Sequence, residues 1–407
     1  MKIFRIIARL NVGGPARHVV WLTSRLQDAE FQSVLVAGTV PDGEEDMSYF
    51  AVENGVTPYY ITELSRELSP KDIVSLFKIY RQIRTEKPDI VHTHTAKAGT
   101  VGRAAAFLYR WLTWRTLIGK PRRIKVVHTF HGHVFHSYYG QLKTWIFTTI
   151  EKILARTATH RIITISEQQF HEIHEQFGIG SREQFRVVPL GIEIGAYENI
   201  ESKRHILRGE IGAAEDEIVV GFVGRLTKIK NISLLIKAAA LVKASAPTPV
   251  IRFVIIGDGE LRSKLEREAA ELGVADTVRF IGNRTNVGDL IPGLDIVVLT
   301  SRNEGTPLSL IEAMACARPF ISTAVGGVVD LAGEPIADEQ GFRVCERGVL
   351  AKPDSAESVA DSLIYLAKNE KLRESLSAKG RDFVAANYST GRLVDDVKEL
   401  YRELLAG

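Results

Sequence analysis

The stretch of sequence that decides the fold spans residues 296–313 and reads Ile296-Val297-Val298-Leu299-Thr300-Ser301-Arg302-Asn303-Glu304-Gly305-Thr306-Pro307-Leu308-Ser309-Leu310-Ile311-Glu312-Ala313. Its apolar start, Ile296–Thr300, has the length and β-branched content of a buried strand. A loop containing Gly305 then leads into an apolar segment with the character of a helix. We expect Thr306 to cap this helix and Pro307 to be its first residue. Strand, loop and helix in this order form the repeating unit of a parallel α/β sheet.

The same unit recurs along the whole chain. The predicted strands of the first half are Lys2–Ala8, Ser33–Ala37, Pro58–Ile61, Ile90–Thr93, Lys125–Thr129 and Arg161–Ile165. Those of the second half are, besides Ile296–Thr300, the segments Ile218–Val223, Arg252–Ile256, Val278–Ile281 and Pro319–Ser322. Helical patterns such as Asp72–Thr85 and Thr144–Arg156 separate the strands, and residues 355–405 have a helical pattern throughout.

A Pro/Gly-marked extended segment, Val187–Ile192, interrupts this rhythm and places a domain boundary near 190–200. The fold class is therefore α/β, with two parallel-sheet domains facing each other across a cleft and a helical C-terminus. We assign residues 1–190 to the first domain, 191–385 to the second, and 386–407 to a last helix that returns to the first. A chain of 407 residues exceeds the size at which one core keeps growing, which agrees with two domains.

Composition narrows the class of protein. Apolar residues make up 45% and charged residues 25%, as in ordinary globular proteins, and the net charge of +3 is too small to indicate a nucleic-acid partner. Cys316 and Cys345 are the only cysteines, so the sequence excludes a disulfide framework and favours a reducing cytoplasm. Residues 1–8 read as a first strand, because charged residues interrupt the apolar run that a signal peptide would need.

Polar residues and glycines follow several strands, at the edge of a parallel sheet where ligands bind. Gly13 and Gly14 follow the first strand and would let backbone amides approach an anion, although a tight turn explains them equally well. Arg225 and Lys230 share one loop and suit a diphosphate. Neither Gly13-Gly14 nor the later Gly257-Asp258-Gly259 forms a dinucleotide fingerprint, which excludes an NAD-dependent dehydrogenase.

Two carboxylates and a histidine complete the candidate site. Glu304 precedes the predicted helix at 307, and Glu312 lies inside it among apolar residues, where burial is costly without partners. The hydroxyl groups of a ribose would be such partners, whereas an exposed helix position is the alternative. His131 follows the predicted strand Lys125–Thr129. Its neighbours His128 and His133 do not complete a familiar zinc pattern, so we predict no metal site and no cofactor.

The spacing of Glu304 and Glu312, the upstream Arg225 and Lys230, and the Gly13-Gly14 pair at the start together resemble the retaining glycosyltransferases of family 4. The resemblance implies the GT-B fold of two facing Rossmann-like domains, and a metal-independent transfer from a nucleotide sugar with retained anomeric configuration. It implies that Arg225 and Lys230 hold the diphosphate and Glu312 the ribose, and that Glu304 and His131 contact the sugar. It further implies that amides near Gly14 and after Gly305, over Thr306, Pro307 and Leu308, complete the phosphate cradle, and that the base lies near Gly282 and Asn283.

Two segments of the sequence bear on the acceptor, the molecule that receives the sugar. Residues 96–103 resemble glycosyltransferases of bacterial envelope polysaccharides. Residues 103–125 carry seven cations and no anion among aromatic and aliphatic residues, a pattern that suits an anionic membrane surface. A core helix followed by a solvated basic loop is the alternative interpretation. We therefore predict a cytoplasmic enzyme at the inner face of the membrane, acting on a lipid-linked sugar or glycan, with UDP as the favoured donor nucleotide.

Two other functions share this fold. A nucleotide-sugar 2-epimerase also cleaves the glycosidic bond of its donor, but its acidic and histidine pattern differs from the spacing of Glu304 and Glu312. A non-catalytic nucleotide-sugar-binding protein would have no need of Arg225, Lys230, Glu304 and Glu312 together.

Overall fold

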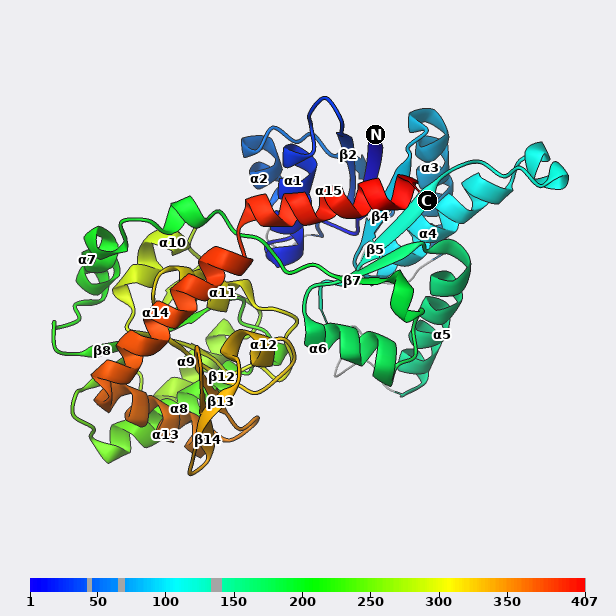
Figure 1. Cartoon of the computed structure of the whole chain (residues 1–407). Coiled ribbons are helices and arrows are strands. Elements are labelled where there is room, and N and C mark those ends of the chain that lie inside the picture. The colour runs from blue at the N-terminus through cyan, green and yellow to red at the C-terminus, as the bar shows by residue number, and fades with distance from the viewer. Residues whose placement is uncertain (42–45, 65–69, 133–140, 407) are drawn as a thin grey trace. The chain divides into compact units, whose positions relative to one another are not determined.

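The computed structural model describes residues 1–41, 46–64, 70–132 and 141–406. The chain divides into two compact units, Met1–Gly191 with Thr390–Gly407, and Ile192–Ser389 (Figure 1). Each unit is built on its own sheet. The segment that joins the first unit from the C-terminus begins at Thr390, four residues later than expected, because the preceding helix continues to Asn387.

The first unit contains a seven-stranded sheet in the order β3-β2-β1-β4-β5-β6-β7, and all its neighbouring strands are parallel. The strands are β1 Lys2–Ile7, β2 Gln32–Gly38, β3 Tyr59–Ile61, β4 Ile90–His94, β5 Lys125–Thr129, β6 Arg161–Thr164 and β7 Phe185–Val187. The α-helices are α1 Gly14–Arg25, α2 Ser48–Glu53, α3 Lys71–Glu86, α4 Ala96–Trp111, α5 Gln141–Ala158, α6 Glu167–Phe170 and α15 Thr390–Ala406. Buried side chains of α3 and α4 form one core cluster with the sheet, and those of α1 and α15 form another.

The second unit contains an eight-stranded sheet in the order β10-β9-β8-β11-β12-β15-β14-β13. The strands are β8 Ile218–Val223, β9 Ile251–Ile256, β10 Val278–Gly282, β11 Ile296–Leu299, β12 Phe320–Thr323, β13 Pro335–Glu339, β14 Phe342–Cys345 and β15 Val349–Ala351. The α-helices are α7 Ile200–Ile211, α8 Ile232–Ser245, α9 Arg262–Glu271, α10 Val287–Leu290, α11 Leu308–Ala315, α12 Val328–Ala332, α13 Ala356–Lys368 and α14 Glu370–Asn387. All pairs from β10 to β15 are parallel, and β14 is antiparallel to both its neighbours.

The predicted α/β class with two parallel sheets is confirmed, and every predicted strand is present within about two residues of its expected ends. Three features of the sheets were not predicted, namely strand β7, the hairpin β13–β14 and strand β15. All five residues of β13 are exposed, and its sequence Pro335-Ile336-Ala337-Asp338-Glu339 has no apolar alternation that would mark a buried strand.

Helix α4 lies unusually close to the first sheet, and its small residues explain why. A Cβ atom on Gly99 would lie 2.4 Å from the His128 ring, and one on Gly102 would lie 2.7 Å from the Thr93 methyl group. Arg103, on the same helix, is fully buried and its Nη2 atom lies 2.6 Å from Glu151 of α5. Residues 96–103 therefore dock α4 on the sheet, and Arg103 does not belong to an exposed basic surface.

The C-terminal helix α15 is fixed to the first unit by a buried polar network. Figure 1 shows this helix in red beside α1. Arg5 of β1 donates from Nη1 to the Tyr401 hydroxyl at 2.9 Å and lies 3.1 Å from His92 Nδ1. Because a guanidinium only donates, His92 Nδ1 must accept, and His92 Nε2 then donates to Thr129 Oγ1 at 2.7 Å. The Tyr401 hydroxyl also lies 2.6 Å from His92 Nδ1 and joins β1, β4, β5 and α15 in one network.

We expect Tyr401→Phe to lower the free energy of unfolding by about 1–3 kcal/mol, because buried groups of Arg5 and His92 would lose a partner. Tyr59→Phe, at a residue 47% exposed, is the matched control and should change it little. Urea unfolding followed by fluorescence measures both. Equal midpoints for the two variants would show that the network does not hold α15.

Candidate functional site

Three loops interlock at the carboxyl edge of the second sheet. A Cβ atom on Gly257 would lie 2.0 Å from the Gly224 carbonyl oxygen, and its φ of 138° favours glycine. The Leu226 amide donates to the Asp258 carbonyl at 2.9 Å, and the Gly257 amide donates to the Gly282 carbonyl at 2.8 Å. The loops after β8, β9 and β10 thus form one continuous surface. Gly257 and Gly259, which fit no nucleotide fingerprint, serve this close approach.

Lys230 and Glu304 form an ion pair on this edge of the sheet. Lys230 Nζ lies 2.6 Å from Glu304 Oε1, and the two side chains are 21% and 10% exposed. Ser301 donates from its hydroxyl to the same carboxylate oxygen at 2.5 Å. The Thr300 hydroxyl donates to the Lys230 and Asn231 carbonyls, which ties the loop after β8 to the end of β11. The structure therefore brings together a cation and a carboxylate that are 74 residues apart in the sequence.

Helix α11 begins one residue later than predicted. Leu308 is its first residue, and Pro307 precedes it with φ −74° and ψ 117°. The prediction that Thr306 caps the helix and Pro307 begins it is wrong, because Pro307 keeps an extended backbone and takes the capping position itself. The Leu310 and Ile311 amides donate to the Pro307 carbonyl at 3.1 and 3.4 Å, whereas the Leu308 and Ser309 amides at the start of α11 precede the first of these bonds.

Glu312 is buried at 7% exposure, so the alternative of an exposed helix position is excluded. Gly305 is covered by the turn after β12, because a Cβ atom on Gly327 would lie 2.3 Å from the Gly305 carbonyl oxygen. Thr323 donates to the Ser301 carbonyl at 2.5 Å and fixes the same loop. Sequence reasoning missed Gly327 and Thr323, although a Gly-Gly pair after an apolar strand was a visible signal.

The remaining predicted residues of the second unit lie on the same interlocked loops. Arg225 is exposed and directly follows Gly224. Gly282 is buried with φ 75°, and a Cβ atom there would lie 3.1 Å from Arg262 Nη1. Asn283, the next residue, is exposed. These predicted residues therefore lie at one edge of the sheet, where Gly282 ends a parallel strand and Arg225, Lys230 and Asn283 follow parallel strands.

In the first unit, Gly13 and Gly14 form the start of helix α1. Gly13 has φ 155° and caps the helix without a side chain, and Pro15 follows within the first turn. The strand-to-helix turn predicted for this segment is confirmed. One helical turn further, His18 is buried at 3% exposure.

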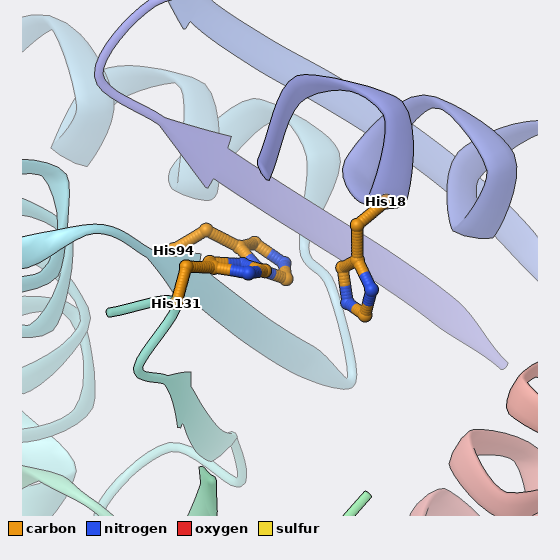
Figure 2. A group of neighbouring side chains, drawn as sticks. All are labelled: His18, His94 and His131. Atoms are coloured by element: carbon orange, nitrogen blue, oxygen red, sulfur yellow. The ribbon is translucent and has the colours of Figure 1, made fainter. Parts of the chain in front are cut away.

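Three histidines meet at the carboxyl edge of the first sheet. His94 ends β4 and His131 follows β5, and their rings are stacked with His94 Nδ1 lying 2.9 Å from His131 Nε2. His18 meets the His131 ring edge-on at 4.8 Å between centroids (Figure 2). Sequence reasoning selected His131 but missed His18. A signal was available, because His18 lies four residues before Leu22 and therefore on the same, apolar face of α1.

Three other histidines of the first unit are not members of this group. His92 belongs to the Tyr401 network. His128 lies on the side of β5 that faces α4, and its Nδ1 atom is 2.8 Å from the Thr93 hydroxyl. His133 lies outside the described residues.

Burial controls the charge of this histidine group. It holds the pKa of His18, His92 and His94 well below the usual 6.5, and neighbouring rings and Arg5 add to the effect. It also lowers the pKa of His131 to about 3. All four rings are therefore neutral at pH 7.

Two parallel-sheet units, each with its polar residues at the carboxyl edge of its strands, define the class of GT-B glycosyltransferases. The chain superposes over 99% of its length on HepE of Anabaena in complex with UDP and glucose, with a TM-score of 0.79 and 20% identity over the whole of that chain. It also superposes on a glycosyltransferase of Rickettsia africae, with a TM-score of 0.73, 16% identity and coverage of 99% and 98%. At these identities the likeness concerns the fold.

The sequence carries a Glycosyltransferase Family 4 domain over residues 12–195 and a Glycosyl transferases group 1 domain over residues 203–383. The protein therefore belongs to this glycosyltransferase family, as the motifs predicted. It is 26% identical to the UDP-Gal:α-D-GlcNAc-diphosphoundecaprenol α-1,3-galactosyltransferase of Escherichia coli, over 87% of this chain and 86% of that one. It is also 26% identical to the capsular polysaccharide biosynthesis glycosyltransferase CapM of Staphylococcus aureus, over 89% and 88% of the chains.

The neutral histidines make the stability of the first unit sensitive to acid. An unfolded histidine titrates near pH 6.5, so between pH 7 and pH 5 the unfolded chain binds protons that the folded chain does not. We expect the free energy of unfolding to fall by up to about 1.4 kcal/mol per pH unit for each buried histidine. Carboxylates such as Asp28, whose pKa the Lys398 ammonium helps to lower to about 2, stay ionised in this range.

Denaturant unfolding at pH 8, 7 and 5 measures the effect. The midpoint should change little from pH 8 to pH 7 and drop clearly by pH 5. A midpoint at pH 5 equal to that at pH 7 would contradict the neutral assignment.

Proposed function

We propose that this glycosyltransferase takes its sugar from a UDP-sugar and transfers it with retained configuration, without a divalent cation, to a lipid-linked sugar or glycan of a cell-surface polymer. The observation that carries the proposal is the Lys230–Glu304 pair, which lies with Arg225 on the interlocked loops of the second unit. The names of the relatives support the donor and the acceptor, since one is named for UDP-Gal and a diphosphoundecaprenol-linked sugar.

The residues of the second unit are assigned to the donor. Lys230 and Arg225 bind the diphosphate and neutralise the charge that develops on the leaving group, which is the task of a metal ion in other transferases. Glu304, held by Lys230 and Ser301, presents its second oxygen to hydroxyl groups of the sugar. Glu312 binds the ribose, and the amides of Leu308 and Ser309, with those near Gly305, bind phosphate oxygens.

The first unit contributes the acceptor side and His131. A neutral His131 hydrogen-bonds the donor sugar, and amides near Gly13 and Gly14 complete the phosphate cradle. Retention follows if the leaving phosphate takes the proton of the acceptor hydroxyl on the same face of the sugar. Among the carboxylates proposed here, Glu304 is already engaged by Lys230, which argues against its use as a covalent nucleophile.

The donor assignment predicts binding in the presence of excess EDTA. We expect UDP and UDP-hexoses to raise the thermal midpoint, because a ligand at ~100 times its dissociation constant adds about 2.7 kcal/mol to stability. Glu312→Gln should lose most of this shift through its ribose contact. Glu374→Gln, at an exposed position of α14, is the matched control and should keep it.

Stabilisation by GDP- or ADP-sugars in place of UDP-sugars would overturn the choice of nucleotide. A shift that appears only with added divalent cation would overturn metal independence. The anomeric proton coupling of the transferred sugar, read by NMR, decides between retention and inversion, and formation of an epimerised sugar without acceptor would identify a 2-epimerase.

We further propose that residues 110–123 contact an anionic membrane surface. This segment ends α4 and forms the 3-10 helix Trp114–Ile118, which stands out beyond α4 in cyan in Figure 1. Leu117 is 89% exposed and Trp114 69% exposed, and Arg115 lies over the Trp114 ring. Apolar side chains flanked by cations fit the headgroup region of an acidic bilayer. No helix among the described residues is long and apolar enough to span a membrane.

Flotation with phosphatidylserine-containing vesicles at low salt tests this contact. Wild type should float with the vesicles and should be released at high salt, because charge attraction is screened. The double variant Trp114→Ser, Leu117→Ser should stay in solution. Ile336→Ser, at an exposed apolar residue of the second unit, is the control and should float like wild type. Absence of wild-type flotation would refute the membrane contact.

A further inference from the structure

The histidine group of the first unit has the composition and spacing of a metal-ligand set. His18, His94 and His131 each offer one ring nitrogen, and these three atoms all lie within 4.8 Å of one another. They come from three separate elements, α1, the end of β4 and the residue pair after β5. Figure 2 shows the stacked rings of His94 and His131, with His18 directed toward them from α1.

Imidazole is a suitable ligand for a transition-metal ion. A neutral imidazole offers one ring nitrogen with a lone pair, and its other nitrogen carries the proton. Because a bound ion displaces any proton on the ligand nitrogen, affinity for the ion falls with falling pH.

The hydrogen bonds leave ring nitrogens without a partner. The contact between His94 Nδ1 and His131 Nε2 uses one nitrogen of each ring. His94 Nε2 and His18 Nδ1 are buried and have no hydrogen-bond partner among the described residues. Because buried polar atoms are nearly always paired, two such nitrogens in one group point to a ligand.

We propose that His18, His94 and His131 form a binding site for a transition-metal dication of the Zn²⁺ type. Three imidazoles suit Zn²⁺, Co²⁺, Ni²⁺ or Cu²⁺ but not Mg²⁺ or Ca²⁺, which prefer oxygen. In a tetrahedral site with metal–nitrogen bonds near 2.0–2.1 Å, ligand nitrogens lie about 3.3 Å apart, so the rings must close by roughly 1.5 Å at most. A fourth position stays open to water.

Metal binding would inhibit the enzyme, a consequence that rests on the proposed contact of His131 with the donor sugar. An ion that holds His131 removes it from the sugar, so the metal and the donor exclude each other. The metal site therefore shares His131 with the proposed donor site, whereas the proposed diphosphate contacts Arg225 and Lys230 belong to the second unit. The buried charge of Arg5 near the group opposes a dication. We therefore expect micromolar affinity, weaker than that of structural zinc sites.

Calorimetric titration of the full, chelator-treated chain with ZnCl₂ at pH 7.5 tests the site. One ion per chain should bind, and MgCl₂ should give no heat. His18→Ala and His131→Ala should each weaken binding by roughly tenfold or more. His171→Ala, at an exposed histidine of the same unit, is the matched control and should bind like wild type. Cys316 and Cys345 are buried and their thiol pKa values are raised, that of Cys316 to about 12, so they do not compete for the ion.

Circular dichroism without metal first establishes that the variants are folded, and His131→Ala, at the least buried of the three positions, remains informative if His18→Ala unfolds. Unchanged Zn²⁺ binding in the folded variants, or equal binding of Mg²⁺, would overturn the site. The titration contains no donor, so its outcome is independent of whether UDP-sugars bind. If Zn²⁺ binds through these histidines but leaves the UDP-sugar thermal shift unchanged, the site stands and the inhibition is refuted.

Discussion

The single direction of the strands is the constraint on which the rest of the structure depends. All neighbouring pairs in the first sheet are parallel, and so are those from β10 to β15 in the second. Loops that leave strands in one direction must meet at one edge, so residues far apart in the sequence become neighbours there. Lys230 and Glu304 in one unit, and His94 and His131 in the other, are brought together in this way.

The carboxyl edges of the two sheets differ in the charge of their side chains. The second unit places a cation and a carboxylate together, and Arg225, on the same loop as Lys230, is exposed. The first unit groups His18, His92, His94 and His131, whose rings burial keeps neutral, near the buried Arg5. Neutral rings donate and accept hydrogen bonds, which suits sugar hydroxyls, and they also coordinate metal ions. Under the two proposals made above, the donor sugar and a metal ion compete for His131.

Much of the fold was predictable because buried parallel strands are continuous apolar runs, and each segment predicted as a strand on this ground proved to be one. The exposed hairpin β13–β14 was not predictable, since nothing apolar marks it. The start of α11 was misplaced by one residue, because Thr306 and Pro307 fit the usual capping pattern but Pro307 stays extended. The roles of the glycines were the hardest feature to predict from the sequence. Gly257, Gly259 and Gly327 matter through what touches them, and a sequence does not record contacts.

The sequence by itself determined the α/β class, the family and the charged residues of the second unit, because periodicity and motif spacing are local properties of the chain. Only the tertiary structure decided that Arg103 is buried against Glu151, that Tyr401 reaches Arg5, and that His18 joins His94 and His131. These facts depend on contacts between distant segments. Burial then sets the charge of each group, and burial exists only after the chain has folded.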